Sequence, residues 1–299
     1  MEIQSLAVYT TLYPGVEPYL NDWRRSLADQ TDTGFDLWFG VDRLSPTELE
    51  RVAQLPPAIW IRSEPWDTPA QIRQRALERI VERYDALVLV DADDILAPDR
   101  IESARRMLEN TDVGACALRL IDRGGADLGY TFGPREDVDP ALLLPRYNVF
   151  GLSNSAYRCT VLKNCLPMPR SCVLIDWLLA TRAWSLSARL RFEPEPHMYY
   201  RQYESNIARV IGPFSATEVR EATARALNHY DIMLTSNWPM AVRAAKLLHA
   251  ANKRAQRFAR AILSDSVLDT YVTKLNELPR EYVWWWSVAH PELEDIWNT

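Results

Sequence analysis

The stretch Ala86-Leu-Val-Leu-Val-Asp-Ala-Asp-Asp94 is the most informative for the fold. In it, a short run of apolar residues is followed directly by three carboxylates. The apolar part predicts a strand buried on both faces, as in a parallel sheet. In open α/β sheets, ligands bind in the crevice outside the carboxyl ends of such strands. Clustered carboxylates there repel one another unless a cation lies among them. We therefore expect Asp91 and Asp93 to hold a divalent metal and a phosphorylated ligand; the alternative is that they cap the next helix.

The sequence around this stretch alternates between strand and helix patterns. Strands are predicted at 5–12, 35–41, 58–62, 113–120, 128–132 and 192–201, and helices at 17–27, 46–53, 69–83, 100–108 and 173–184. Residues 134–145 predict an irregular surface loop, and only helices are expected from residue 216 onward. This rhythm predicts βαβ units and an α/β fold with a mostly parallel sheet flanked by helices. We expect an α/β domain at 1–212 and a helical C-terminal extension at 213–299.

Composition excludes several classes of function. A formal net charge of -6 gives no indication of a nucleic-acid partner. The four cysteines form no C-x-x-C pair, which argues against a zinc site and favours reduced thiols. The N-terminus lacks a signal-peptide pattern, and no apolar stretch approaches the roughly 20 residues of a membrane span. A cytoplasmic protein is expected. No G-x-G-x-x-G motif supports dinucleotide binding.

The segment Leu87-Val-Leu-Val-Asp-Ala-Asp-Asp-Ile-Leu-Ala-Pro-Asp-Arg-Ile-Glu102 resembles the D-x-D segment of family 2 glycosyltransferases, which have the GT-A fold. The resemblance extends in order over about the first two thirds of the chain. It implies a metal-dependent, inverting transfer of a sugar from a nucleotide-diphosphate sugar to the hydroxyl of a carbohydrate or glycoconjugate acceptor. The implied cofactor is Mn²⁺ or Mg²⁺, and the implied enzyme is of the hexosyltransferase type.

The resemblance also implies which residues bind the donor and the metal. Thr10 lies in the first strand, which contacts the nucleotide, and Asp42 occupies the position of an acid that recognises the base. The helix at 69–83 offers Arg73 or Arg75 to the nucleotide, the alternative for either being a solvated helix face. The remaining implied donor contacts are Asp91, Ala92 and Arg201, and the implied metal ligands are Asp91, Asp93 and His197. His197 is read alternatively as a structural histidine, and Asp94 as the cap of the following turn.

The pair Ile175-Asp176 precedes Trp177 and is similar to the acidic pair that opens a helix near the acceptor in that family. The resemblance makes Asp176 the general base that removes the proton of the acceptor hydroxyl. The alternative is a helix cap. The segment Asn148-Val-Phe-Gly-Leu-Ser-Asn-Ser-Ala-Tyr-Arg158 resembles the acceptor side, with an ordinary strand and turn as the alternative.

Two other functions remain open beside this one. A sugar-phosphate nucleotidyltransferase would carry a Gly-rich N-terminal loop with a Lys, which is absent. The alternative from a different class is a catalytically silent protein on the same fold, which binds a carbohydrate or a nucleotide sugar or serves as a scaffold. The sequence also lacks Q-x-x-R-W, the mark of processive members of the family, so a single sugar addition is expected.

The C-terminal region carries two unusual features. Between Trp238 and Leu263, Arg and Lys residues recur along one helical stripe without an acid. This stripe predicts either a solvated helix face or a contact with an anionic lipid at the inner membrane face, a lipid-linked acceptor or a partner protein. Second, Tyr282-Val-Trp-Trp-Trp286 with Trp297 forms a Trp cluster, which we expect to pack inside the protein. Sugar stacking and a dimer interface are the alternatives.

Overall fold

A computed structural model describes residues 2–45, 47–48, 55–134, 138–203, 206, 208–279 and 282–298. These residues form two compact units, between which the chain passes repeatedly. The sheet unit comprises Met1–Thr131, Phe150–Ser171 and Ala188–Arg201, and the helical unit comprises Phe132–Val149, Cys172–Ser187 and Gln202–Thr299. The predicted helix at 46–53 lies almost wholly outside the described residues. The domain division at residue 212 stays a prediction.

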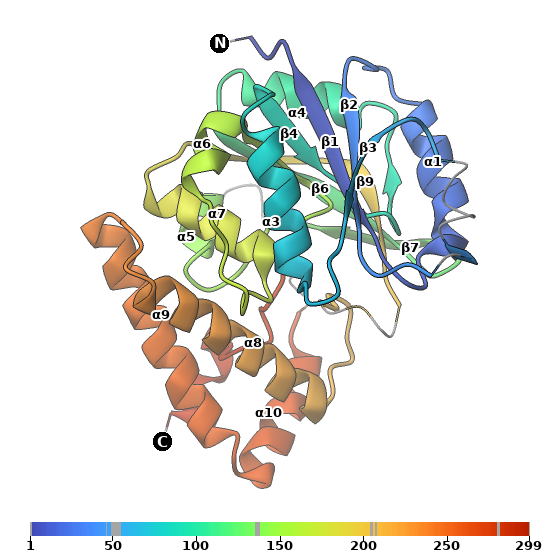
Figure 1. Ribbon diagram of the computed structural model, residues 1–299. Helices are drawn as coiled ribbons and strands as arrows, with labels where there is room; N and C mark the ends of the chain where they lie inside the picture. Colours follow the sequence, from blue (N-terminus) through green and yellow to red (C-terminus); the bar gives the residue numbers. More distant parts are fainter. Residues whose placement is uncertain are drawn as a thin grey trace. The chain divides into compact units, whose positions relative to one another are not determined.

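A single mixed sheet runs through the sheet unit (Figure 1). Its strands are β1 (Leu6–Leu12), β2 (Asp36–Val41), β3 (Ile59–Arg62), β4 (Ala86–Leu89), β5 (Ile95–Leu96), β6 (Val113–Ile121), β7 (Asp127–Phe132), β8 (Ser155–Arg158) and β9 (Leu190–Arg201). The described order is β3-β2-β1-β4-β8-β6-β9-β5, with β7 beside β6. The first four strands in this order are parallel, β8 is antiparallel to its neighbours, and β6 and β9 are parallel again. The predicted α/β fold with a mostly parallel central sheet is confirmed.

Helices cover both faces of this sheet. They are η1 (Glu17–Tyr19), α1 (Leu20–Ala28), α3 (Pro69–Ile80), α4 (Arg100–Leu108) and α6 (Cys159–Asn164). Side chains of neighbouring strand residues point to opposite faces. Phe39 of β2 packs against Trp23 of α1, with ring centroids 5.8 Å apart. The next residue, Gly40, faces α3, and a Cβ there would lie only 2.1 Å from the Tyr9 hydroxyl. Glycine at this position therefore makes room for Tyr9.

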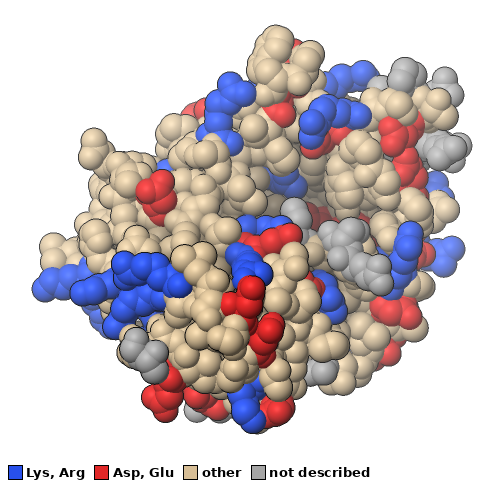
Figure 2. All heavy atoms as spheres, turned by 90° about the horizontal axis from the view of Figure 1, so that it is seen from below, with Lys and Arg blue, Asp and Glu red and all other residues tan. Residues whose placement is uncertain are grey.

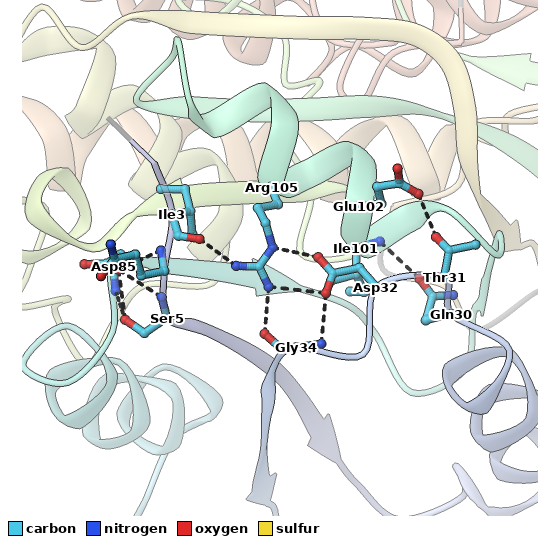
Figure 3. Close-up of polar contacts among 11 residues, drawn as sticks. Ile3, Ser5, Gln30, Thr31, Asp32, Gly34, Asp85, Ile101, Glu102 and Arg105 are labelled. Carbon is cyan, nitrogen blue, oxygen red and sulfur yellow. Dashed lines mark hydrogen bonds and ion pairs between the residues drawn. The ribbon is translucent and has the colours of Figure 1, made fainter.

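The amino ends of the strands are held by a polar network (Figure 3). Arg105 of α4 donates to the Asp32 carboxylate at 2.6 Å and to the carbonyl oxygens of Ile3 and Gly34 at 2.8 and 2.7 Å. These partners precede β1 and β2. The hydrogen bond from Arg105 lowers the pKa of Asp32. These hydrogen bonds tie the segments that precede β1 and β2 to α4.

The helical unit contains α5 (Pro140–Leu143), α7 (Ile175–Ser185), α8 (Ala216–Thr235), α9 (Val242–Ala261), α10 (Asp265–Glu277), η2 (Pro291–Leu293) and α11 (Glu294–Trp297). Its centre is the buried Trp177 of α7, which stacks on His229 of α8 at 4.1 Å and parallel to Trp285 at 6.2 Å. Burial lowers the pKa of His229 to about 3, so its ring stays neutral. The tryptophans of the Trp cluster are buried, which confirms the packing prediction.

The strands and helices predicted from periodicity are confirmed within a few residues, but several short elements differ. The strand β5 and the helix α6 lie where no separate element was predicted, whereas β8 lies in the segment 148–158, for which a strand and turn was the alternative. The predicted irregular loop at 134–145 contains α5, which begins where the Asp139 carboxylate accepts a hydrogen bond from the Ala141 amide at 2.9 Å. Elements of two to six residues are too short to show a hydrophobic period, so tertiary contacts decide them.

Candidate functional site

The parallel strands β1, β2 and β4 bring two predicted donor-binding residues to one edge of the sheet. The amide of Asp42, which follows β2, donates to the Leu12 carbonyl at the end of β1 at 2.8 Å. The amide of Val90, which follows β4, donates to the Tyr9 carbonyl of β1 at 3.1 Å. Asp42 and Asp91 therefore emerge on either side of β1, at the carboxyl edge where α/β sheets bind ligands.

The pKa of the Tyr9 phenol is affected by charged residues at this edge. Burial raises the pKa of Tyr9, the positive charge of Arg73 opposes this, and the negative charges of Asp91 and Asp42 add to it. Three of the predicted donor-binding residues, from three different elements, therefore act on one hydroxyl group. Sequence reasoning passed over Tyr9, because within an apolar strand its ring looks like part of the core.

The two candidate arginines of α3 have different surroundings. Arg75 forms an ion pair with Asp67 and donates to the Arg62 carbonyl at 2.8 Å, so it ties the start of α3 to the end of β3. Arg73 donates a long hydrogen bond, 3.3 Å, to the Pro69 carbonyl of its own helix, and its charge acts on Tyr9. Arg75 therefore has a structural role, whereas the charge of Arg73 acts on the same phenol as those of Asp42 and Asp91.

The acidic turn, residues 91–94, has one carboxylate facing inward. Asp94 is 1% exposed; one of its oxygens accepts from the Ser153 hydroxyl and the other from the Arg201 amide at 2.7 Å. Burial, together with the charges of Asp93 and Asp91, raises the pKa of Asp94 well above its usual range. The expectation that Asp94 merely caps the following turn is wrong: it anchors the acidic turn to β9 and to the segment before β8.

Arg201, at the end of β9, is 1% exposed and lies against the same turn. Its guanidinium donates to the carbonyl oxygens of Asp93 at 2.7 Å and Arg123 at 2.9 Å, and meets the Asp22 carboxylate at 3.3 Å. The Tyr19 ring lies 4.8 Å from it. These contacts hold the acidic turn in place; the contact with the donor pyrophosphate stays a prediction.

Three further predicted residues are buried in the sheet unit. Thr10 lies within β1 and is 1% exposed, and Ala92 within the acidic turn is fully buried. The ring of His197 is paired with the Asp99 carboxylate at 2.9 Å, and its carbonyl accepts from the Ala97 amide. This places His197 beside the loop before α4, and its role as a metal ligand stays a prediction.

The donor set at the acidic turn fits a metal shared with phosphate groups. In the described part of the chain, no three His, Cys, Asp or Glu side chains gather into a group that could hold a metal ion by themselves. Both oxygens of Asp94 accept hydrogen bonds within the protein, and Asp91 and Asp93 are the other two carboxylates of the turn. Mg²⁺ is typically held by one or two carboxylates together with substrate phosphates and water. Two carboxylates are therefore a sufficient protein contribution.

Asp176 belongs to the helical unit, in the first turn of α7. The helix is preceded by Leu174, so the alternative of Asp176 as its N-cap is not what the structure shows. One carboxylate oxygen accepts from the Asn148 side-chain amide at 2.9 Å. The next residue, Trp177, donates its indole N–H to the Leu144 carbonyl at 2.9 Å and fixes the start of the helix.

A cavity of about 890 Å³ lies elsewhere in the sheet unit. It is lined by α1, by the start of β2 and by Pro56 and Pro57. Since Asp42 follows the carboxyl end of β2 and this cavity lies at its amino end, the cavity is not part of the candidate site.

The basic stripe predicted near the C-terminus lies on α9 and is exposed. Its members are Arg243, Lys246, Lys253, Arg257 and Arg260. At 3.6 residues per turn they share one face, opposite the buried Ala244, Leu248, Ala251, Ala255 and Phe258. Figure 2 shows Lys and Arg gathered at the left, the side on which α9 lies in Figure 1. No helix in the described ranges combines the length and apolar character needed to cross a bilayer.

Comparisons with known proteins bear on the fold. No family model and no curated protein matches the sequence. Residues 1–349 of S. aureus TarS, solved with UDP-GlcNAc, align with a TM-score of 0.59 and 17% identity, over 86% of this chain and 74% of that one. A longer TarS structure aligns with a TM-score of 0.58 and 16% identity, over 84% of this chain but only 43% of its own.

A third solved structure is similar over most of both chains. Mannosyltransferase PcManGT from Pyrobaculum calidifontis, in complex with GDP-Man and Mn²⁺, aligns with a TM-score of 0.60 and 15% identity. The alignment covers 93% of this chain and 80% of that one. At such identity the likeness establishes the fold alone. The chain has the GT-A fold with a helical C-terminal region, as expected from the sequence.

Proposed function

We propose that the protein is a metal-dependent, inverting glycosyltransferase of the hexosyltransferase type, related to family 2, which adds a single sugar to an acceptor hydroxyl. One observation carries the proposal: the parallel pairing of β1 with β2 and β4 brings Asp42 and Asp91 out on either side of β1 at the carboxyl edge of a GT-A sheet. Solved structures of this fold include complexes with UDP-GlcNAc and with GDP-Man and Mn²⁺. The donor proposed for this chain is likewise a nucleotide-diphosphate sugar.

Each residue of the carboxyl edge has a part in binding this donor. Asp42 is proposed to accept hydrogen bonds from the base, beside the main chain of Thr10. Arg73 is proposed to approach the nucleotide, because Arg75 is already paired with Asp67. Asp91 and Asp93 would hold Mn²⁺ or Mg²⁺, which when bound offsets the negative charge that develops on the leaving diphosphate. Arg201 keeps the turn that carries them in place.

The transfer itself is proposed to be one displacement with inversion. The acceptor oxygen bonds to the anomeric carbon as the bond from that carbon to the diphosphate oxygen breaks. The hydroxyl proton passes to the Asp176 carboxylate, and the nucleoside diphosphate departs. A general base must lie within hydrogen-bond reach of the proton that it removes. Asp176, in the first turn of α7, is proposed to reach the acceptor hydroxyl in this way.

A screen of nucleotide sugars tests the proposal and identifies the donor. Thermal unfolding is followed with UDP-, GDP-, CMP- and dTDP-sugars, each with Mn²⁺, with Mg²⁺ and with EDTA. A ligand at 100 times its Kd stabilises the folded state by about 2.7 kcal/mol. We expect such a shift with one nucleotide class, and its loss in EDTA because the diphosphate then loses its metal.

The variants Asp91→Asn and Asp93→Asn supply the specific comparison for that screen. Each should lose the metal-dependent part of the shift, while Asp127→Asn, at an exposed carboxylate paired with Arg119, should keep it. If a donor binds but is neither transferred nor hydrolysed, the catalytically silent binding protein is the correct function. If no nucleotide sugar shifts the transition in any metal, the donor site is refuted.

The basic stripe of α9 supports a proposed peripheral contact with an anionic membrane surface. Each basic residue near such a surface contributes about 1 kcal/mol. The triple variant Arg243→Gln, Lys246→Gln, Lys253→Gln should therefore bind vesicles containing phosphatidylglycerol about 10²-fold more weakly. Co-sedimentation measures this. A triple Gln variant at Lys163, Arg189 and Arg191, exposed but each paired with an acid, should bind as the unaltered protein does. Equal binding by both triple variants would contradict the proposal.

A further inference from the structure

We propose that Asn148 is a positioning residue for the Asp176 carboxylate, and that the C-terminal segment around Trp284 holds Asn148 in place for this task. The inference rests on Asp176 acting as the base in the proposed function. It assigns a part in catalysis to Asn148, which the sequence places only in an acceptor-like segment, and to Trp284, which the sequence places only in the Trp cluster.

The side chains of Asn148 and Asp176 are in direct contact. The Asn148 amide nitrogen Nδ2 donates to Oδ2 of Asp176 at 2.9 Å, and Asn148 is fully buried. An ionised carboxylate only accepts hydrogen bonds, so the NH₂ end of the Asn148 amide must face it. The donor is therefore matched to the charged form of Asp176, which is the form that takes a proton.

Asn148 itself is held by the main chain of a segment far along the sequence. The Asn148 amide donates to the Trp284 carbonyl at 3.2 Å, and the Trp284 amide donates to the Asn148 carbonyl at 3.1 Å. The two residues form an antiparallel bridge outside the named strands. With its backbone fixed on both sides, the short Asn side chain has little freedom, so the position of Nδ2 follows that of Trp284.

The segment that carries Trp284 is in turn fixed to the helical unit. The Trp284 ring packs against Phe132 with centroids 4.1 Å apart. The buried Tyr271 hydroxyl of α10 donates to the Ser287 carbonyl at 2.8 Å and accepts from the His290 amide at 2.9 Å. A continuous set of contacts thus leads from α10 through the Trp cluster to the Asp176 carboxylate.

A general base gains from such support in two ways. A displacement of about 1 Å from the productive geometry can cost 10²-fold in rate. A hydrogen bond donated to the carboxylate also favours its charged form and so lowers the pH below which the base is protonated. Removing the donor should therefore slow the reaction and move the acid limb of the pH–rate profile to higher pH.

The test uses the full chain and hydrolysis of the donor that the screen identifies, with water in place of the acceptor. For Asn148→Ala we expect kcat to fall about 10²-fold, an unchanged KM for the donor, and an acid limb shifted to higher pH. The isosteric Asn148→Asp keeps the shape but places a second carboxylate beside Asp176, so its shift should be larger. If Asn148→Ala does not fold, the acid limb of Asn148→Asp provides the test.

The matched control is Tyr230→Phe, which removes another buried hydrogen bond of the same unit, from Tyr230 to the Pro145 carbonyl at 2.9 Å. Its kcat and acid limb should be unchanged. A folded Asn148 variant with an unshifted acid limb would overturn the inference, whatever its kcat. Full activity in Asp176→Asn would instead refute the base of the proposed function, so the two failures are distinguishable.

Discussion

Replacing Asp176 by Asn is expected to lower kcat by about 10²- to 10⁴-fold, the usual contribution of a general base. The substitution keeps the size of the side chain and its hydrogen bond with Asn148 but removes the group that accepts the proton. Stopped assays of nucleoside diphosphate release measure the rate. Binding of the donor, followed by thermal shift with metal, should be unchanged because Asp176 takes no part in holding the diphosphate.

The control for this variant is Asp265→Asn, which also replaces a first-turn carboxylate of a helix in the same unit. Asp265 is exposed and paired with Arg220. It should retain full activity. A rate for Asp176→Asn within a few-fold of the control would mean that another group, or water alone, takes the proton, and the assignment of the base would be wrong.

Replacing Arg201 by Met is expected to lower the free energy of unfolding by about 1–3 kcal/mol. The substitution leaves the buried carbonyl oxygen of Asp93 without its donor, and the part-buried carbonyl oxygen of Arg123 loses a donor as well. Equilibrium urea unfolding, followed by tryptophan fluorescence and circular dichroism, measures the change. Since Arg201 holds the acidic turn, donor binding should weaken together with stability.

Arg189→Met is the matched control, at the residue preceding the other end of β9. Its guanidinium is largely exposed and pairs with Asp112 at the surface. An exposed pair of this kind contributes at most about 1 kcal/mol. If Arg201→Met is as stable as this control and yet fails to bind the donor, the guanidinium contacts the pyrophosphate, as the family resemblance implies. A loss of stability supports the structural role.

How far the sequence predicted the fold depended on the length of each element. The buried strand at 86–89 and the helices α3 and α4 carry strong local signals: a continuous apolar run, a Pro at the helix start and a regular apolar face. The two residues of β5 carry none of these and are paired only because β9 passes beside them. Such an element depends on a partner more than a hundred residues away, which no local pattern can indicate.

The acidic residues of the candidate site could be predicted from the sequence, but the residues that hold them in place could not. Asp42 and Asp91 follow apolar strands, so their place at the carboxyl edge could be inferred from the strand order. That Asp94 turns inward depends on Ser153 and Arg201, which reach it from distant parts of the chain. From the sequence, Arg201 was expected to bind the ligand. Its burial could not be predicted, because tertiary contacts decide whether a charged residue is buried. Asn148 has no signal of its own beyond lying in an acceptor-like segment.

The bridge between Asn148 and Trp284 has a consequence for the order in which the protein forms during synthesis. The strands β1 to β4 lie within the first ninety residues and can pair early, since chains fold progressively from the N-terminus as they are made. The helix α7 follows soon afterwards, but its neighbour Asn148 waits for a segment made near the end. A ribosome-bound chain stopped before residue 284 should therefore be able to form the carboxyl edge of the sheet, while the Asp176 carboxylate is not yet held in position. Donor binding should appear before catalytic turnover as the nascent chain lengthens.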